Sequence, residues 1–186
     1  MCSSDLHLAR AQQANIAVHG AKTLPASQRY TGVVWDHLDL ASLPLATQKI
    51  AAKNIVIISG LLGLVTAGDH TPDYRLKIGA SLAPMGKLSS WWRDEISNAL
   101  NKYCAGAVVI SLLPQEHSAA FVADRELIKS YLHVDLATKS GKPGGHDAKA
   151  AKGRLARHLL LNRTDPVKAL KSFKDSQFKV RVLDQF

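Results

Sequence analysis

The stretch from residue 149 to 163, KAAKGRLARHLLLNR, combines six basic side chains with a run of Leu and Ala. On a helical projection Leu155 and Leu159 form one apolar stripe, and the cations do not gather on the face opposite to it. Some of them must lie beside the stripe, with packed methylene groups and charged ends at the rim of a cleft. Arginine suits forked contacts with phosphate, and lysine suits a point-charge contact. The candidate anion-binding residues are Lys149, Lys152, Arg154 and Arg157.

The charge of the whole chain favours the same partner. The 186 residues include 24 Lys and Arg against 15 Asp and Glu, a net charge of +9. Half of these cations lie between Lys139 and Arg181, where few acids occur. Such asymmetry indicates a polyanion, with nucleic acid first and an anionic membrane surface second. The alternatives are an ordinary basic surface, and capping of the helix by Asp147, which would neutralise the nearby lysines.

Composition excludes several classes of protein. An apolar fraction of 46% with 21% charged residues is typical of a globular domain. No apolar run of about 18 residues occurs, so we expect no membrane span. The start, MCSSDLHLAR, lacks the pattern of a secretory signal. Two cysteines and scattered histidines predict a cytoplasmic protein with no disulfide framework, no metal site and no cofactor.

Two tempting catalytic motifs fail on spacing. GASLAPMGKLSS has Ser81 and Leu88 where a phosphate-binding P-loop needs Gly and Ser or Thr. No Gly-x-Ser-x-Gly elbow is present either. No catalytic residue is therefore assigned, and an enzymatic role stays open but less favoured.

The hydropathy pattern predicts an α/β (mixed α+β) fold in a single domain over residues 1–186, with a central mixed β-sheet, flanking helices and a basic cleft. Asp165 and Pro166 are typical of a helix start. Strands are expected at residues 30–35, 55–58, 107–114, 126–136 and 178–184, a turn at 141–145, and helices at residues 5–19, 43–54, 87–103, 149–163 and 165–173.

Polar residues that follow the buried strands define a second candidate site. Ser59 ends one predicted strand, Glu116 follows another, and Tyr74 and Arg75 stand in the loop between them. In open α/β sheets the crevice at the carboxyl ends of strands is where ligands bind. These residues could therefore share a crevice with Tyr30, or Arg75 and Glu116 could form a purely structural ion pair or never meet.

The blocks RYTGVVWDHLDL, IISGLLGLVTAGDHTPDYRLKIG, WWRDEISNAL, VVISLLPQEH and KAAKGRLARHLLLNR together resemble the peroxide-stress protein YaaA family, in its actinobacterial style. The resemblance runs in order from about residue 24 to 172. The family residues matched here are Tyr30, Thr31, Gly32, Ser59, Gly60, Gly63, Tyr74, Arg75, Leu76, Glu116, Lys149, Lys152, Gly153 and Arg157.

The resemblance implies a cytoplasmic, non-enzymatic DNA-binding protein with a positively charged cleft. It also implies a role in defence against hydrogen peroxide that limits iron-driven damage. Double-stranded DNA is then the expected partner, and neither a membrane nor an obligate protein partner is indicated. The alternative is a small-ligand binder, hydrolase or transferase that acts on an anionic metabolite or nucleotide in the same cleft.

The chain departs from the family pattern in three places. Residues 1–23 match poorly, and the family's N-terminal strand and helices are expected to be missing before Tyr30. Ser118, Ala119 and Ala120 stand where the family has a lysine, and GKPGGHDA replaces a hydrophobic strand. Part of the expected cleft therefore differs from that of the family.

Overall fold

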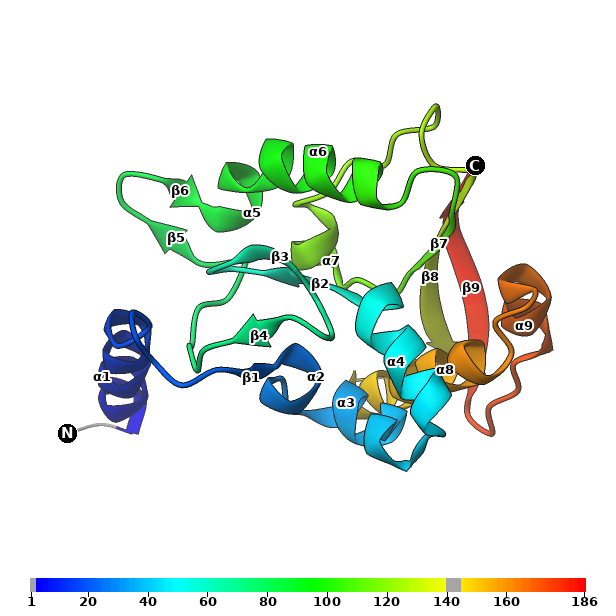
Figure 1. The fold of residues 1–186 in the computed structure, drawn as a ribbon, viewed down its shortest axis with the longest axis horizontal. Helices are drawn as coiled ribbons and strands as arrows, with labels where there is room; N and C mark the ends of the chain where they lie inside the picture. The colour runs from blue at the N-terminus through cyan, green and yellow to red at the C-terminus, as the bar shows by residue number, and fades with distance from the viewer. Residues whose placement is uncertain (1–2, 140–144) are drawn as a thin grey trace. The chain divides into compact units, whose positions relative to one another are not determined.

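The computed structural model describes residues 3–139 and 145–186, which fold into helices and short strands of a mixed α/β class (Figure 1). The chain divides into two compact units, each built from separate segments. Unit one comprises Met1–Arg29, Ala52–Ala99 and Gln115–Val122. Unit two comprises Tyr30–Ala51, Leu100–Pro114 and Ala123–Phe186.

Unit one is built from antiparallel strand pairs and helices. The pairs are β1 (Leu24–Pro25) with β4 (His70–Thr71), β2 (Val56–Ser59) with β3 (Gly63–Thr66), and β5 (Ser81–Leu82) with β6 (Gly86–Lys87). Its helices are α1 (Ser3–Ile16), α2 (Ala26–Arg29), α5 (Leu88–Trp91), the first part of α6 (Arg93–Tyr103) and α7 (Gln115–Ser118). Ile58, Ile78, Leu88 and Ile96 are almost fully buried in this unit.

Unit two contains a three-stranded mixed sheet in the order β7-β8-β9. Strand β7 (Val108–Ser111) runs parallel to β8 (Ser130–Thr138), and β9 (Phe178–Gln185) runs antiparallel to β8. The helical elements of this unit are α3 (Val33–Leu38), the 3-10 turn η1 (Leu40–Ser42), most of α4 (Leu45–Asn54), α8 (Gly145–Leu161) and α9 (Pro166–Ser172).

The core of unit two lies between this sheet and two helices. Val134 and Leu136 alternate along β8 and contact Ala151 and Leu155 of α8, together with Leu170 of α9. Leu155 is fully buried, and burial of such a side chain contributes about 2 kcal/mol. The predicted apolar stripe of this helix is therefore confirmed, and it fixes which way the basic residues of α8 can point.

Several sequence predictions are confirmed. Strands overlap the predicted ranges 55–58, 107–114 and 178–184, and helices overlap 5–19, 43–54, 87–103 and 149–163, the last of which begins earlier, at Gly145. Asp165 caps α9, because its Oδ1 accepts a hydrogen bond from the Lys168 backbone N–H at 2.9 Å. Most of the turn expected at residues 141–145 lies outside the described residues.

The prediction of a strand over residues 30–35 was wrong. Gly32, at a φ of 115°, is followed by helix α3, in which the Asp36 N–H donates to the Gly32 carbonyl at 3.0 Å. Helix α3 packs on α8. The β-branched residues of this segment are therefore held in a helix by tertiary packing that overrides their propensity.

The strand expected at residues 126–136 begins later, at Ser130. The Asp124 carboxylate accepts hydrogen bonds from the backbone N–H groups of Glu126 at 2.8 Å and Leu127 at 3.3 Å. An aspartate that bonds its own downstream backbone forms a turn in place of a ladder. The mixed sheet also occupies unit two alone, and the described strands of unit one form separate pairs.

Candidate functional site

Lys152 of α8 connects the two parallel strands of unit two. Its Nζ donates to the Leu112 carbonyl, just after β7, at 3.2 Å and lies 3.2 Å from Oδ1 of Asp135 on β8. The lysine side chain is only 15% exposed. Burial by itself would raise the pKa of the Asp135 carboxyl. The Leu136 backbone N–H and Lys152 lower this pKa by more, so it lies below its ordinary value. Lys152 is thus part of the packing of α8 on the sheet.

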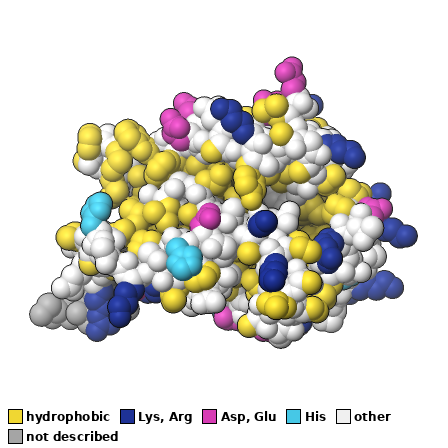
Figure 2. Space-filling model, viewed as in Figure 1, with side chains coloured by type: hydrophobic (Ala, Val, Ile, Leu, Met, Phe, Trp, Pro, Cys, Tyr) yellow, Lys and Arg dark blue, Asp and Glu magenta, His cyan; other side chains and the backbone are white. Residues whose placement is uncertain are grey.

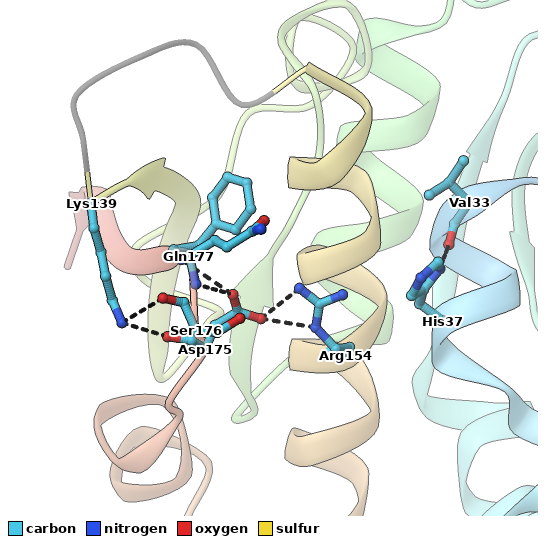
Figure 3. A network of polar contacts seen from close by, with 8 residues as sticks. Val33, His37, Lys139, Arg154, Asp175, Ser176 and Gln177 are labelled. Carbon is cyan, nitrogen blue, oxygen red and sulfur yellow. Dashed lines mark hydrogen bonds and ion pairs between the residues drawn. The ribbon is translucent and has the colours of Figure 1, made fainter.

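Arg154 binds an almost fully buried carboxylate (Figure 3). Its Nε and Nη2 donate to Oδ2 of Asp175 at 2.8 and 2.6 Å, and the Asp175 side chain is 3% exposed. The other carboxylate oxygen accepts the backbone N–H groups of Gln177 and Phe178, at 3.0 and 3.2 Å. Burial raises the pKa of Asp175, but these backbone bonds and Arg154 outweigh it and hold the pKa below its ordinary value.

Arg157 closes the end of helix α3. Its Nη1 donates to the carbonyls of Leu38 at 3.0 Å and Asp39 at 2.8 Å. The last carbonyls of a helix have no partner within the helix, so a guanidinium here replaces water. Asp39 has a left-handed φ of 45°, and its carboxylate lies 3.7 Å from the same guanidinium.

Gly153 lies where α8 and α3 meet. A Cβ atom at this position would come within 2.4 Å of the Val34 carbonyl oxygen and 2.8 Å of His37 Cβ. His37 itself is held within α3 by a bond of 2.9 Å to the Val33 carbonyl (Figure 3). Only glycine allows the two helix backbones to approach this closely.

Lys149 differs from the three cations that follow it. It is exposed and, within the described part of the chain, forms no ion pair, so the interpretation in which Asp147 neutralises it is not seen as a contact. Other exposed cations of unit two, on or after α8, also form no ion pair with a described carboxylate. They include Arg163, Lys168, Lys171, Lys174 and Lys179.

In unit one the structure brings Ser59 and Tyr74 together. The two hydroxyl oxygens are 2.6 Å apart, and Ser59 is 2% exposed. Ser59 Oγ also accepts the backbone N–H groups of Leu61 at 3.2 Å and Leu62 at 2.9 Å. Through these contacts Ser59 stabilises the turn between β2 and β3.

Arg75 and Glu116 have other neighbours. The guanidinium of Arg75 is 62% exposed and pairs with Asp73, while its backbone N–H donates to Asn15 Oδ1 at 2.8 Å. Glu116 rests on Gly79, where a Cβ would lie 2.6 Å from the carboxylate. No ion pair joins Arg75 to Glu116 among the described residues. Tyr30 belongs to unit two, where its ring stacks on Trp35 at 6.3 Å between centroids.

A family model described as "Peroxide stress protein YaaA" matches residues 1–182. The chain belongs to this family. The match includes residues 1–23, and the Tyr30, Ser59, Tyr74 and Gly153 blocks lie within it.

Two relatives of this YaaA-family chain illustrate its range. It is 35% identical over 161 residues to a UPF0246 protein of Streptomyces coelicolor, with 84% of this chain and 60% of the relative covered. It is 32% identical over 153 residues to a UPF0246 protein of Francisella tularensis subsp. novicida, with 77% and 59% covered. The chain thus spans about three fifths of the length of these curated relatives.

Neither a metal-binding cluster nor a membrane-spanning helix is found among the described residues. No three His, Cys, Asp or Glu side chains among them are grouped so that they could hold a metal ion. Within residues 3–139 and 145–186, no helix has the length and apolarity that a bilayer crossing requires.

A hollow beside α9 and β9 of unit two, here called the lysine hollow, was not predicted from the sequence. It has a volume of about 530 Å³. Its lining residues are Leu132, Lys139, Val167, Leu170, Lys171, Phe173, Lys174, Asp175, Phe178, Lys179, Val180, Val182 and Gln185. On the face drawn in Figure 2, Lys and Arg side chains lie among hydrophobic ones over unit two. The sequence feature that could have indicated the hollow is the mixture of Lys with apolar residues in PVKALKSFKDSQFKVRV.

Proposed function

We propose that this YaaA-family chain acts in the cytoplasm in peroxide defence and binds the phosphates of double-stranded DNA through the basic surface of unit two. The observation that carries the proposal is the group of exposed cations on and after α8, with Lys149 as a direct contact. These side chains form no ion pair with a described carboxylate, so they need not give up a protein partner when they meet a phosphate.

The other three predicted anion-binding residues have a structural role in this proposal. Lys152, Arg154 and Arg157 fasten α8 to the sheet, to Asp175 and to α3. Asp175 is almost fully buried and would be costly to leave unpaired, so Arg154 is held in place. Lys152 and Arg157 are held by backbone carbonyls, and all three cations add positive charge without moving toward DNA. The proposal therefore assigns them to the support of the basic surface and assigns direct phosphate contact to exposed side chains.

The family description supports the peroxide part of the proposal. Neutralised phosphates attract fewer hydrated metal cations, because bound protein releases the counterions that DNA condenses. Protein bound to DNA would thus lower the local concentration of iron without a metal site of its own.

The test is a titration of duplex DNA at several salt concentrations, followed by fluorescence anisotropy. We expect log Kd to rise linearly with log salt, with about 0.9 unit of slope for each phosphate neutralised. A triple variant, Lys149→Gln with Arg163→Gln and Lys168→Gln, should lower the slope by about two to three units. Lys87→Gln, an exposed substitution in unit one, is the control and should leave the slope within about one unit.

The same proteins can be added to DNA exposed to ferrous iron and hydrogen peroxide. We expect the unmodified chain to reduce strand breakage and the triple variant to lose that protection in proportion to its lost affinity. Absence of binding at low salt, or a slope that the triple variant leaves unchanged, would reject DNA binding through this surface.

A further inference from the structure

The lysine hollow exists because α9 is too short to cover β9. Helix α9 spans Pro166–Ser172, whereas β9 continues from Phe178 to Gln185 at the edge of the sheet. Exposure rises along the strand from 3% at Phe178 to 45% at Val182, with Val180 half-buried between them. Since alternate residues of a strand share a face, the apolar row starts in the core and ends in the open.

Apolar side chains form the floor of the hollow. Leu170 and Phe178, each 3% exposed, belong to the core, and Val167 and Phe173 of the α9 segment are half-buried beside them. Phe173 is also fixed from behind, because its ring meets the His158 ring edge-on at 5.5 Å between centroids. A floor of this kind is formed before any ligand arrives.

Positive charge surrounds the floor. Asp175 is the acidic residue among the lining, and its carboxylate is taken up by Arg154 and two backbone N–H groups (Figure 3). Lys139 is likewise occupied, since its Nζ donates to the carbonyls of Asp175 at 2.7 Å and Ser176 at 2.9 Å. Lys171, Lys174 and Lys179 are exposed and form no ion pair with a described carboxylate.

We propose that the lysine hollow binds a small amphiphilic anion, with the apolar part of the ligand on Phe173, Val180 and Val182 and its carboxylate or phosphate on Lys171, Lys174 and Lys179. A volume of about 530 Å³ falls within the range of small-ligand sites, which join a mainly apolar lining to a few polar anchors. The lysines provide point charges without a fixed fork, so they accept either headgroup. These three lysines also belong to the basic surface proposed for DNA, whereas Lys149, Arg163 and Lys168, which the DNA titration varies, lie outside the lining of the hollow.

The test is calorimetric titration of the full chain with octyl phosphate, octanoate, inorganic phosphate and octanol. We expect saturable one-to-one binding of at least one of the two amphiphiles, and the two arms identify the preferred headgroup. Inorganic phosphate and octanol should each bind at least tenfold more weakly. Shortening the alkyl chain should weaken binding by up to about fourfold for each methylene removed.

Two variants distinguish the contribution of the charged headgroup contacts from that of the apolar floor. Lys171→Gln with Lys174→Gln and Lys179→Gln should weaken binding at least tenfold, while the matched triple of Lys149, Arg163 and Lys168 should leave it within twofold. Val182→Trp fills the hollow without a change of charge, at an exposed strand position that tolerates an aromatic residue, and should abolish binding. Circular dichroism checks that each variant is folded.

Three results would overturn the proposal. The first is inorganic phosphate that binds as tightly as octyl phosphate, which would mean that the apolar floor contributes nothing. The second is amphiphile binding that survives both Val182→Trp and the hollow triple. The third is concentration-dependent dimerisation that Val182→Trp abolishes, which would make a second copy of the chain the occupant.

Discussion

Gly60 in unit one and Gly153 in unit two both allow close approach of backbones, but their surroundings differ in charge. At Gly60 a Cβ would lie 2.6 Å from the Leu76 carbonyl oxygen, and neutral groups complete the contact. The Trp92 indole donates to the Gly60 carbonyl at 3.0 Å, next to the Ser59–Tyr74 pair. At Gly153 the close contacts are with Val34 and His37 of α3, and the residues on either side in the sequence are the cations Lys152 and Arg154.

Basic residues in a motif therefore need not face a ligand. In unit two, lysine and arginine side chains bind backbone carbonyls or a buried carboxylate. In unit one, the contacts around Gly60 come from the uncharged side chains of serine, tyrosine and tryptophan. Ion pairs with a half-exposed partner contribute little by themselves, but a buried partner left alone is costly. Substitutions in unit one and in unit two should therefore destabilise the fold for different reasons.

The largest effect is expected where added volume meets backbone. Gly153→Ala and Gly60→Ala should each lower the free energy of unfolding by about 3 kcal/mol, because the new Cβ atom has no room in either place. Urea unfolding followed by fluorescence measures the loss. Lys149→Ala, on the exposed face of α8, is the control and should change stability by less than about 0.5 kcal/mol. A fully stable Gly153→Ala would mean that α3 does not lie on α8 as described.

An intermediate effect is expected from Arg154→Met, which keeps the length of the side chain but leaves Asp175 without its counterion. We expect a loss of about 2 kcal/mol at neutral pH, less than for a fully buried pair because Arg154 is 40% exposed. Arg163→Met, at an exposed position without an ion pair to a described residue, is the matched control.

The pH dependence of the Arg154→Met variant sharpens the test. The folded-state pKa of Asp175 is lowered, so its stabilisation is complete above the unfolded pKa of about 3.9 and is lost as pH falls through the folded value. The difference between the original chain and Arg154→Met should therefore shrink below about pH 4. A difference that stays constant down to pH 2 would assign the effect to packing and not to charge.

The smallest effect is expected in the neutral network of unit one. Ser59→Ala removes the acceptor of two backbone N–H groups and should cost about 1.5 kcal/mol, whereas Tyr74→Phe should cost about 1 kcal/mol. In a double-mutant cycle in urea, the loss for the double variant should be smaller than the sum of the two single losses, since both variants remove the same bond. Strict additivity would show that the two hydroxyls do not interact in solution.

Local patterns predicted the elements that local chemistry determines. The β-branched run at residues 55–58 and the Asp165–Pro166 start of α9 needed no tertiary information. Val33 and Val34 favour a strand by propensity, yet they form a helix because α8 offers a glycine to pack against. That partner lies more than a hundred residues away, where no local pattern can reveal it.

The candidate site was harder to predict, for the same reason. The sequence identified Lys152, Arg154 and Arg157 as cations beside an apolar stripe, but it could not reveal that Asp135, Asp175 and the Leu38 carbonyl would receive them. The lysine hollow depends on the unequal lengths of α9 and β9, which become visible only when the two are placed side by side.

The guanidinium of Arg157 has a consequence for how this region opens. Because it holds the last carbonyls of α3 from a side chain of α8, the end of α3 cannot fray without losing its bonds to α8. The two helices should therefore behave as one cooperative segment, and their amide protons should exchange with solvent deuterium at a shared free energy of opening.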